Sequence, residues 1–237
     1  VPTQVGEHLT AEGTTLGSDN GIGVAAMLAI IEENELVHGP LEFLFTVDEE
    51  TGLTGAGKLD AGLLQGKQLI NLDSEEEGIL YVGCAGGGES ELRLSLEMGE
   101  VPGDTVTMPV DLKGLKGGHS GCDIHLGRGN AIKLLGRILW TAYLETPFSL
   151  VRMDGGSAHN AIPREAFSTL VVRRDLVDTI VSRMREELEL ARHEYGAADS
   201  GMELMIGEAS PFRAIWTEAT TCSVLRLVNA LPHGVSR

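Results

Sequence analysis

Several features are missing from this 237-residue sequence, and each absence excludes some classes of protein. It has no apolar run of membrane-spanning length, and its N-terminus lacks the basic-then-apolar pattern of a secretory signal. Lys and Arg number 18 against 35 Asp and Glu, a formal net charge of −17. Phosphate binding needs clustered basic residues, so this charge argues against nucleic acid as a partner. We expect a soluble, cytoplasmic globular protein.

Cysteine is also scarce. Cys84, Cys122 and Cys222 are odd in number and widely spaced, and none belongs to a CxxC pair. This usage is typical of reduced thiols in a cytosolic protein rather than of a disulfide framework or a structural zinc site. Glycine, by contrast, is abundant at 31 residues, and many of these glycines stand beside polar residues. That pattern indicates turns that aim side chains.

The first 88 residues have the pattern of an α/β domain. A helix is expected over residues 18–31, with Ser18 as its N-cap, because apolar residues recur there at helical spacing. The short apolar runs 41–47, 68–72 and 79–85 are typical of buried strands. Residues 54–66 are expected to form a connecting helix. Together these elements predict a mainly parallel sheet covered by helices.

The pattern changes after the glycine run 86–88, which we interpret as a domain boundary. Residues 91–97 and 105–112 alternate apolar and polar positions, as half-exposed antiparallel strands do. Residues 130–145 and 176–195 have amphipathic helical spacing, 165–173 reads as a strand, and a helix begins near residue 220. The sequence therefore predicts a second, α+β domain over residues 89–237.

Carboxylates lie at an end of three of the expected elements in the first domain. Asp19 stands at a helix start, Glu49 and Glu50 follow one strand, and Asp73 follows the next. Because ligands collect at the carboxyl ends of parallel strands, these acids could form an oxygen-rich metal site. Without histidines, such a site suits magnesium or calcium as well as zinc. Alternatively, Asp19 only caps its helix, and the Asp48–Glu50 run is a solvated turn.

Five motifs in order resemble one family, from about Gly13 to the C-terminus. They are TTLGSDNGIG, VDEETG, NLDSEEEG followed by YVGCAGG, LKGGHSGCDIHLGRGNA and GGSAHNAIPREA. These motifs are similar to those of the aminoacyl-histidine (Xaa-His, carnosinase-like) dipeptidases. These enzymes belong to the zinc-dependent family that includes carboxypeptidase- and aminoacylase-type enzymes. The resemblance implies a catalytic domain over residues 1–88 and an inserted lid or dimerisation domain over residues 89–237.

The resemblance also implies roles for the acids. Asp19 would bridge two divalent ions, expected to be zinc, with Glu50 as a ligand of one ion and Asp73 as a ligand of the other. Glu49 would be the general base. A metal pair lowers the pKa of a shared water, and a carboxylate outside the ligand set can then take its proton.

The second domain would supply the remaining groups. His119 lies among glycines, which allow close backbone approach, and resembles the lid histidine that stabilises the oxyanion formed at the peptide carbonyl. In several relatives this histidine acts across a dimer interface. Asn160 resembles a residue that contacts the substrate, with Arg164 in support. The other polar side chains near His119 are expected to hold their loop together: Asp123, His125 and Arg128.

The sequence departs from the family pattern at two histidines. The family takes one metal ligand from an HxD motif before the position of Asp19 and another from near the end of the full-length chain. His8 is followed by Leu and Thr, and His233 lacks the expected context. We therefore expect an internal piece that binds zinc poorly by itself; calorimetric titration showing tight binding of two zinc ions would contradict this.

The leading hypothesis is a metal-dependent dipeptidase of short, histidine-containing peptides, with a possible homodimer through the lid. A related deacylase or aminopeptidase, and a non-catalytic dimerisation or binding module, are the alternatives.

Overall fold

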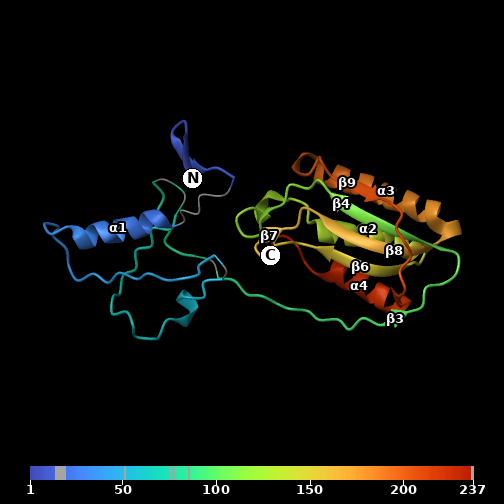
Figure 1. The fold of residues 1–237 in the computed structure, drawn as a ribbon, viewed down its shortest axis with the longest axis horizontal. Helices are drawn as coiled ribbons and strands as arrows, with labels where there is room; N and C mark the ends of the chain where they lie inside the picture. The colour runs from blue at the N-terminus through green and yellow to red at the C-terminus, as the bar shows by residue number, and fades with distance from the viewer. Residues whose placement is uncertain (14–19, 51, 75, 77, 85, 236–237) are drawn as a thin grey trace. The chain divides into compact units, whose positions relative to one another are not determined.

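The computed structural model describes residues 1–13, 20–50, 52–74, 76, 78–84 and 86–235. The chain divides into two compact units, Val1–Gly88 and Glu89–Arg237 (Figure 1). Asp19 and Ser18 lie outside the described residues.

The first unit begins with a hairpin and continues into one long helix. Strands β1 (Pro2–Val5) and β2 (His8–Ala11) pair antiparallel around Gly6, whose φ is 63°. Helix α1 spans Gly21–Glu32, and the Asn20 side chain caps it by accepting a hydrogen bond from the Gly23 N–H at 3.1 Å. The helix expected here is confirmed, with Asn20 as its described cap.

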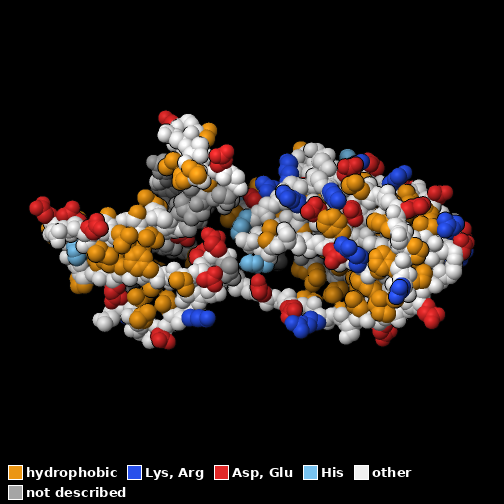
Figure 2. All heavy atoms as spheres, in the orientation of Figure 1, with side chains coloured by type: hydrophobic (Ala, Val, Ile, Leu, Met, Phe, Trp, Pro, Cys, Tyr) orange, Lys and Arg blue, Asp and Glu red, His pale blue; other side chains and the backbone are white. Residues whose placement is uncertain are grey.

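Apolar side chains remain exposed in this unit. Figure 2 shows them gathered over α1, where Ile22, Leu28 and Ile31 are between 49% and 74% exposed. Among the described residues of the unit, only Gly23 is buried. A helix that is apolar on all sides is ordinarily buried on all sides, so the surface of α1 is one that other polypeptide would normally cover.

The parallel sheet predicted for this unit is not formed by the described residues. The segments 41–47, 68–72 and 79–84 have irregular backbone, so the predictions of strands there are wrong for this structure. Val82, Leu80 and Ile70 are 84% or more exposed. An apolar run becomes a buried strand only where neighbouring strands take up its N–H and C=O groups, and the described residues offer these segments no such ladder.

The predicted connecting helix is also much shorter than expected. Within residues 54–66 only Ala56–Lys58 is helical, as the single 3₁₀ turn η1. Glycines at 55, 57, 62 and 66 account for this, since each glycine lowers helix stability by roughly 1 kcal/mol relative to alanine.

The second unit is an antiparallel α+β structure, as predicted. Its elements in chain order are β3 (Met98–Gly99), β4 (Thr105–Lys113), β5 (Gly118–His119), η2 (Ile124–Leu126), α2 (Ala131–Glu145), β6 (Ser149–Gly155), β7 (Ala161–Ile162), β8 (Ala166–Arg173), η3 (Arg174–Leu176), α3 (Val177–Tyr195), η4 (Gly196–Ala198), β9 (Glu203–Ile206), β10 (Ile215–Trp216) and α4 (Glu218–Ala230). The main sheet has the order β6-β8-β4-β9, with all pairs antiparallel. Helix α2 packs on this sheet and contacts both α3 and α4 (Figure 1).

The core of this unit lies between the sheet and its helices. Met108, Val110 and Leu112 alternate along β4 and are at most 2% exposed, and Leu170 opposes Met108 on β8. This alternation is what predicted the strand at 105–112, and the strand at 165–173 and the helices at 130–145 and 176–195 are likewise confirmed. The strand expected at 91–97 is wrong: its leucines are 44–53% exposed, and the described residues of the segment form no ladder.

Candidate functional site

A short ladder in the second unit brings two of the predicted site residues together. Strand β5 pairs with β7, so that His119 lies opposite Ala161 and Gly118 opposite Ile162. The ladder continues one residue further, where the Ser120 N–H donates to the Asn160 carbonyl oxygen at 2.8 Å. His119 on β5 and Asn160 in the turn just before β7 are therefore close together although they are distant in sequence.

Glycine is required in this ladder because the backbone is tightly surrounded. Gly117 and Gly118 have φ values of 64° and 146°, a region that side-chain-bearing residues rarely adopt. A Cβ added at Gly118 would collide with the Asp123 and Arg128 side chains, and one at Gly117 would lie 2.9 Å from the Ile162 carbonyl oxygen. The run of glycines before His119 thus allows three segments to meet at this histidine.

An ion pair holds the loop that follows His119. The Asp123 Oδ2 accepts the His119 N–H at 2.9 Å and an Arg128 Nη1 hydrogen at 3.0 Å. The same Arg128 nitrogen donates to the Gly117 carbonyl oxygen at 2.7 Å. The expectation that Asp123 and Arg128 hold this loop is confirmed; His125 lies in the intervening turn η2.

A buried carboxylate anchors both ends of the same loop. Asp199, 1% exposed, accepts the Lys116 N–H at 2.7 Å and the Gly129 N–H at 2.6 Å. This role of Asp199 was not predicted from the sequence. Asp199 sits in a small turn after α3, and no local pattern connects it with a loop about 70 residues earlier. Only the packing of α3 against α2 brings the two together.

Arg164, which was predicted to support substrate contact, lies beside the glycines that precede β5. Its carbonyl oxygen accepts the Leu115 N–H at 3.3 Å, and its Cβ borders the space that a side chain at Gly117 would need. These contacts fix the backbone of Arg164 beside the glycines. The role of its guanidinium stays a prediction.

The acids of the first unit lie in turns. Backbone N–H groups of Gly52 and Leu53 donate to the Glu49 carbonyl oxygen at 3.1 and 2.9 Å, and the Asp73 N–H donates to the Asn71 side chain at 3.2 Å. The side chains of Glu49, Glu50 and Asp73 are exposed. The carboxyl edge of a parallel sheet was expected to gather them, and that sheet is not formed by the described residues.

The exposed acids of the first unit can be tested as ligands of a metal ion. In the part of the chain that the structure describes, no three His, Cys, Asp or Glu side chains come together as a metal site. Asp19, the expected bridging ligand, is not among the described residues. Glu50 and Asp73 by themselves thus do not provide a ligand set for a zinc pair.

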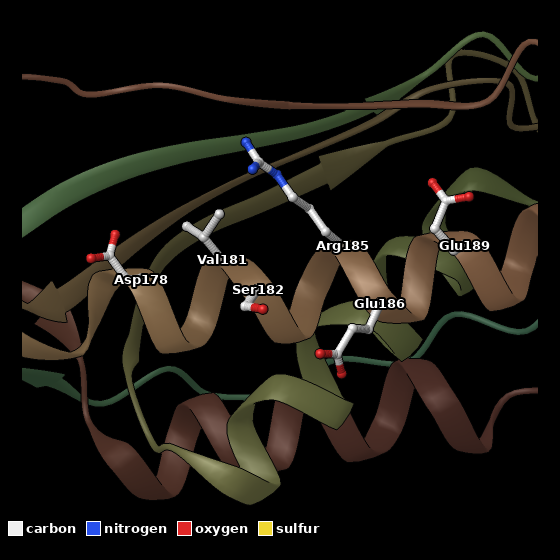
Figure 3. A pocket seen from close by; sticks show the side chains of 6 residues that line it. All are labelled: Asp178, Val181, Ser182, Arg185, Glu186 and Glu189. Carbon is white, nitrogen blue, oxygen red and sulfur yellow. The ribbon is translucent and has the colours of Figure 1, made fainter.

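A shallow hollow on α3 is distinct from the predicted site. Figure 3 shows it along one face of the helix, where its lining is mostly charged and solvated: Asp178, Val181, Ser182, Arg185, Glu186 and Glu189. None of the predicted site residues contributes to it. Separately, no described helix combines the length and apolar character needed to cross a membrane.

Comparison with known proteins shows what the chain is similar to. Residues 110–198 match the family described as the peptidase dimerisation domain. The chain is 44% identical over 232 residues to the cytosol non-specific dipeptidase of Escherichia coli K12, an alignment covering 98% of this chain and 48% of that protein. It also superposes on the crystal structure of aminoacylhistidine dipeptidase from Vibrio alginolyticus with a TM-score of 0.76 and 41% identity, covering 100% of this chain and 48% of that one.

The chain thus spans about half the length of the relatives that it matches. The resemblance seen in the five sequence motifs is confirmed by both relatives. The chain contains a peptidase dimerisation domain and is, over its whole length, a homologue of the aminoacylhistidine and non-specific dipeptidases.

Proposed function

We propose that the protein is a metal-dependent dipeptidase that hydrolyses short peptides in the cytoplasm, including those of the Xaa-His type. The observation that carries this proposal is the 44% identity to a cytosol non-specific dipeptidase across 232 residues. That alignment extends through nearly all of the chain, so it takes in the His119 loop as well as the acids of the first unit. In this proposal residues 1–88 are part of the catalytic domain and residues 89–237 are the lid and dimerisation domain.

In the second unit, His119 would donate a hydrogen bond to the carbonyl oxygen as the peptide bond is attacked. Such a donor acts most strongly on the negative charge that develops in the transition state. Asn160, one step along the ladder from His119, would contact the substrate, and Arg164 would support that contact. The β5–β7 pairing supports this assignment because it brings both residues next to the glycine-rich loop.

In the first unit, Glu49 would take a proton from the attacking water and return it to the leaving amine. Asp19, Glu50 and Asp73 would hold two divalent ions, of which zinc is the proposed kind. When bound, such ions lower the pKa of a water and polarise the carbonyl. Because the described acids do not form a metal site by themselves, we propose that polypeptide beyond these 237 residues contributes imidazole ligands and covers α1.

The breadth of the substrate range is a separate question. One relative is named non-specific and the other aminoacylhistidine dipeptidase. A panel of dipeptides, with and without a C-terminal histidine, compared with N-acyl amino acids and longer peptides, would measure it. Cleavage of N-acyl amino acids without cleavage of any dipeptide would identify a deacylase instead and overturn the proposal.

The test of the site uses the complete protein with its metal. The His119→Ala variant should lose about a hundredfold or more in kcat, the typical cost of one oxyanion donor. His193→Ala, on the exposed side of α3, is the matched control and should retain activity. Equal kcat values for the two variants would show that His119 takes no part in the reaction.

The dimerisation domain supports one further part of the proposal, that the protein forms a homodimer through its second unit.

A further inference from the structure

The His119 ring accepts two backbone hydrogen bonds at the same nitrogen. The N–H groups of Gly121 and Cys122 both point at Nδ1, each at an N···N distance of 3.1 Å. A backbone N–H can only donate, so the nitrogen that accepts from it carries no hydrogen. The neutral ring must then carry its one hydrogen on Nε2.

The fold of the loop keeps these two donors in place. The Asp123 N–H donates to the His119 carbonyl oxygen at 3.0 Å, which closes a turn over residues 119–123. The Asp123 carboxylate accepts the His119 N–H from the other direction and is itself held by Arg128. Residue 119 is thereby tied at its N–H, its carbonyl oxygen and its ring.

Glycine at position 121 lets the His119 ring come close to the backbone of the loop. A Cβ there would lie 3.3 Å from both Nδ1 and Cε1 of His119, tighter than ordinary contacts.

The Asp123–Arg128 pair is better shielded from solvent than the other Asp–Arg pairs of the unit. Its side chains are 29% and 25% exposed, against 58% and 65% for Asp175 and Arg173. A shielded pair is less weakened by solvent and holds a more definite geometry.

We propose that Asp123 and Arg128 are positioning residues that fix His119 as its Nε2–H tautomer and direct that hydrogen away from the loop. The other ring nitrogen, Nδ1, accepts both hydrogen bonds from the loop. Nε2–H is therefore the group that can meet a ligand. The loop therefore selects the tautomer whose hydrogen lies on Nε2, the group that would donate to a carbonyl oxygen.

The part of this inference that concerns the carbonyl oxygen rests on the proposed function, whereas the tautomer does not. The tautomer can be measured in the 237-residue chain by ¹⁵N–¹H correlation spectra of its histidine rings at neutral pH, since the two tautomers give different two-bond patterns. His119→Gln assigns the His119 signals. We expect the neutral ring to be a single tautomer with the hydrogen on Nε2.

Variants of Asp123 separate positioning from general stability. In Asp123→Ala the turn loses its anchor, and a second His119 signal with the hydrogen on Nδ1 should appear. Asp123→Asn retains an oxygen that can accept the His119 N–H, and should restore the single Nε2–H form. Asp175→Ala removes the carboxylate of the exposed Arg173–Asp175 pair and should leave the His119 signals unchanged. Dispersed amide spectra establish that each variant is folded.

Two results would overturn the inference. Wild-type spectra with mixed tautomers, or with the hydrogen on Nδ1, would show that the loop does not select Nε2–H. An unchanged His119 tautomer in Asp123→Ala would show that Asp123 has no positioning role. In the complete enzyme, Asp123→Ala should lower kcat about tenfold, as removal of a group that orients a histidine does, with recovery in Asp123→Asn. Lost activity in every dipeptide assay with the tautomer intact would instead count against the proposed function alone.

Discussion

Adjacent acids in the Asp48–Glu50 run have different surroundings. Asp48 has a φ of 59°, its carboxylate accepts a hydrogen bond from the Thr54 hydroxyl, and its carbonyl oxygen accepts the Thr54 N–H at 3.2 Å. It is a turn residue, and aspartate tolerates this left-handed conformation better than most residues. Glu49 and Glu50 follow with exposed side chains that the turn presents to solvent.

The division of roles between Glu49 and Glu50 gives a prediction for the complete enzyme. Glu49→Gln should abolish turnover while leaving the metal content near that of the wild type, because an amide cannot take the proton from water. Glu50→Gln should lose metal, because an amide oxygen is a weaker ligand than a carboxylate. Parallel measurement of kcat and of metal by atomic emission checks both. Asp48→Asn keeps the turn chemistry and is the control; metal loss in Glu49→Gln would contradict the assignment.

Single residues differ in how far sequence alone could place them. Asp123 and Arg128 were predicted as loop-holding residues because both lie within the glycine-rich motif that they stabilise. Asp199 was not, because its two partners at residues 116 and 129 are brought to it by tertiary packing. The tautomer of His119 also depended on the structure, since it is set by which backbone N–H groups the ring meets.

At the scale of elements, the helices and most strands of the second unit were predicted well, whereas the strand at 91–97 and the apolar strands and connecting helix of the first unit were not. β4 shows its burial in an alternation that the strand carries within itself, whereas β8 is buried along most of its length. The runs 41–47 and 68–72 are largely apolar, and such a run becomes a strand only when partner strands exist elsewhere. The described residues supply no such partners, so these segments have irregular backbone. The order β6-β8-β4-β9 is likewise a property of pairing that no single segment encodes.

The contact between α2 and α3 includes an ion-pair network around one arginine. Arg137 Nε donates to Glu187 at 2.7 Å and Nη1 donates to Glu194 at 2.6 Å. Burial of the guanidinium acts to lower the pKa of Arg137, but the hydrogen bonds and charges of Glu194 and Glu187 outweigh it, so the pKa is raised above its ordinary value. Glu187 is only 6% exposed, and Arg183 lies within 3.6 Å of its other oxygen.

Replacing Arg137 tests how much this network stabilises the helix pair. Arg137→Met should lower the free energy of unfolding of the second unit by about 2 kcal/mol, because two charge-assisted hydrogen bonds are lost and Glu187 stays buried. Tryptophan fluorescence during urea unfolding reports this unit specifically, since both tryptophans, Trp140 and Trp216, belong to it. Arg185→Met, on the exposed face of α3 (Figure 3), is the matched control. Equal midpoints in the two variants would contradict the prediction.

At the scale of the whole chain, the two units differ in how much apolar surface they bury. The second unit has a continuous core that includes Leu112, Leu139 and Leu170 at 0% exposure, whereas Gly23 is the one buried residue among those described in the first. Local opening free energy follows such burial and the number of protected backbone hydrogen bonds. The second unit should therefore be the more stable part of the 237-residue chain.

Hydrogen exchange of the isolated chain measures this difference directly. Amides of β4 and β8 should exchange slowest, at rates set by global unfolding of their unit, and those of segments 41–47 and 68–72 should exchange within the shortest labelling times. Protection of these two segments equal to that of β8 would show that they pair as strands in solution. The same measurement on a longer protein containing this chain should then show the segments gaining protection, if further polypeptide completes their sheet as proposed.

The final prediction concerns assembly of the second unit. Among the described strands of its main sheet, β6 and β9 are the outer ones, and such edges present unpaired N–H and C=O groups that a second copy can use. Sedimentation velocity over a range of concentrations should show a dimer that dissociates on dilution. Met205→Lys on β9 and Val151→Lys on β6 each place a charge at one edge, so the edge that forms the contact is the one whose variant dissociates at higher concentration. A dimer unaffected by both would place the contact on a helix face, and a monomer at every concentration would contradict the homodimer itself.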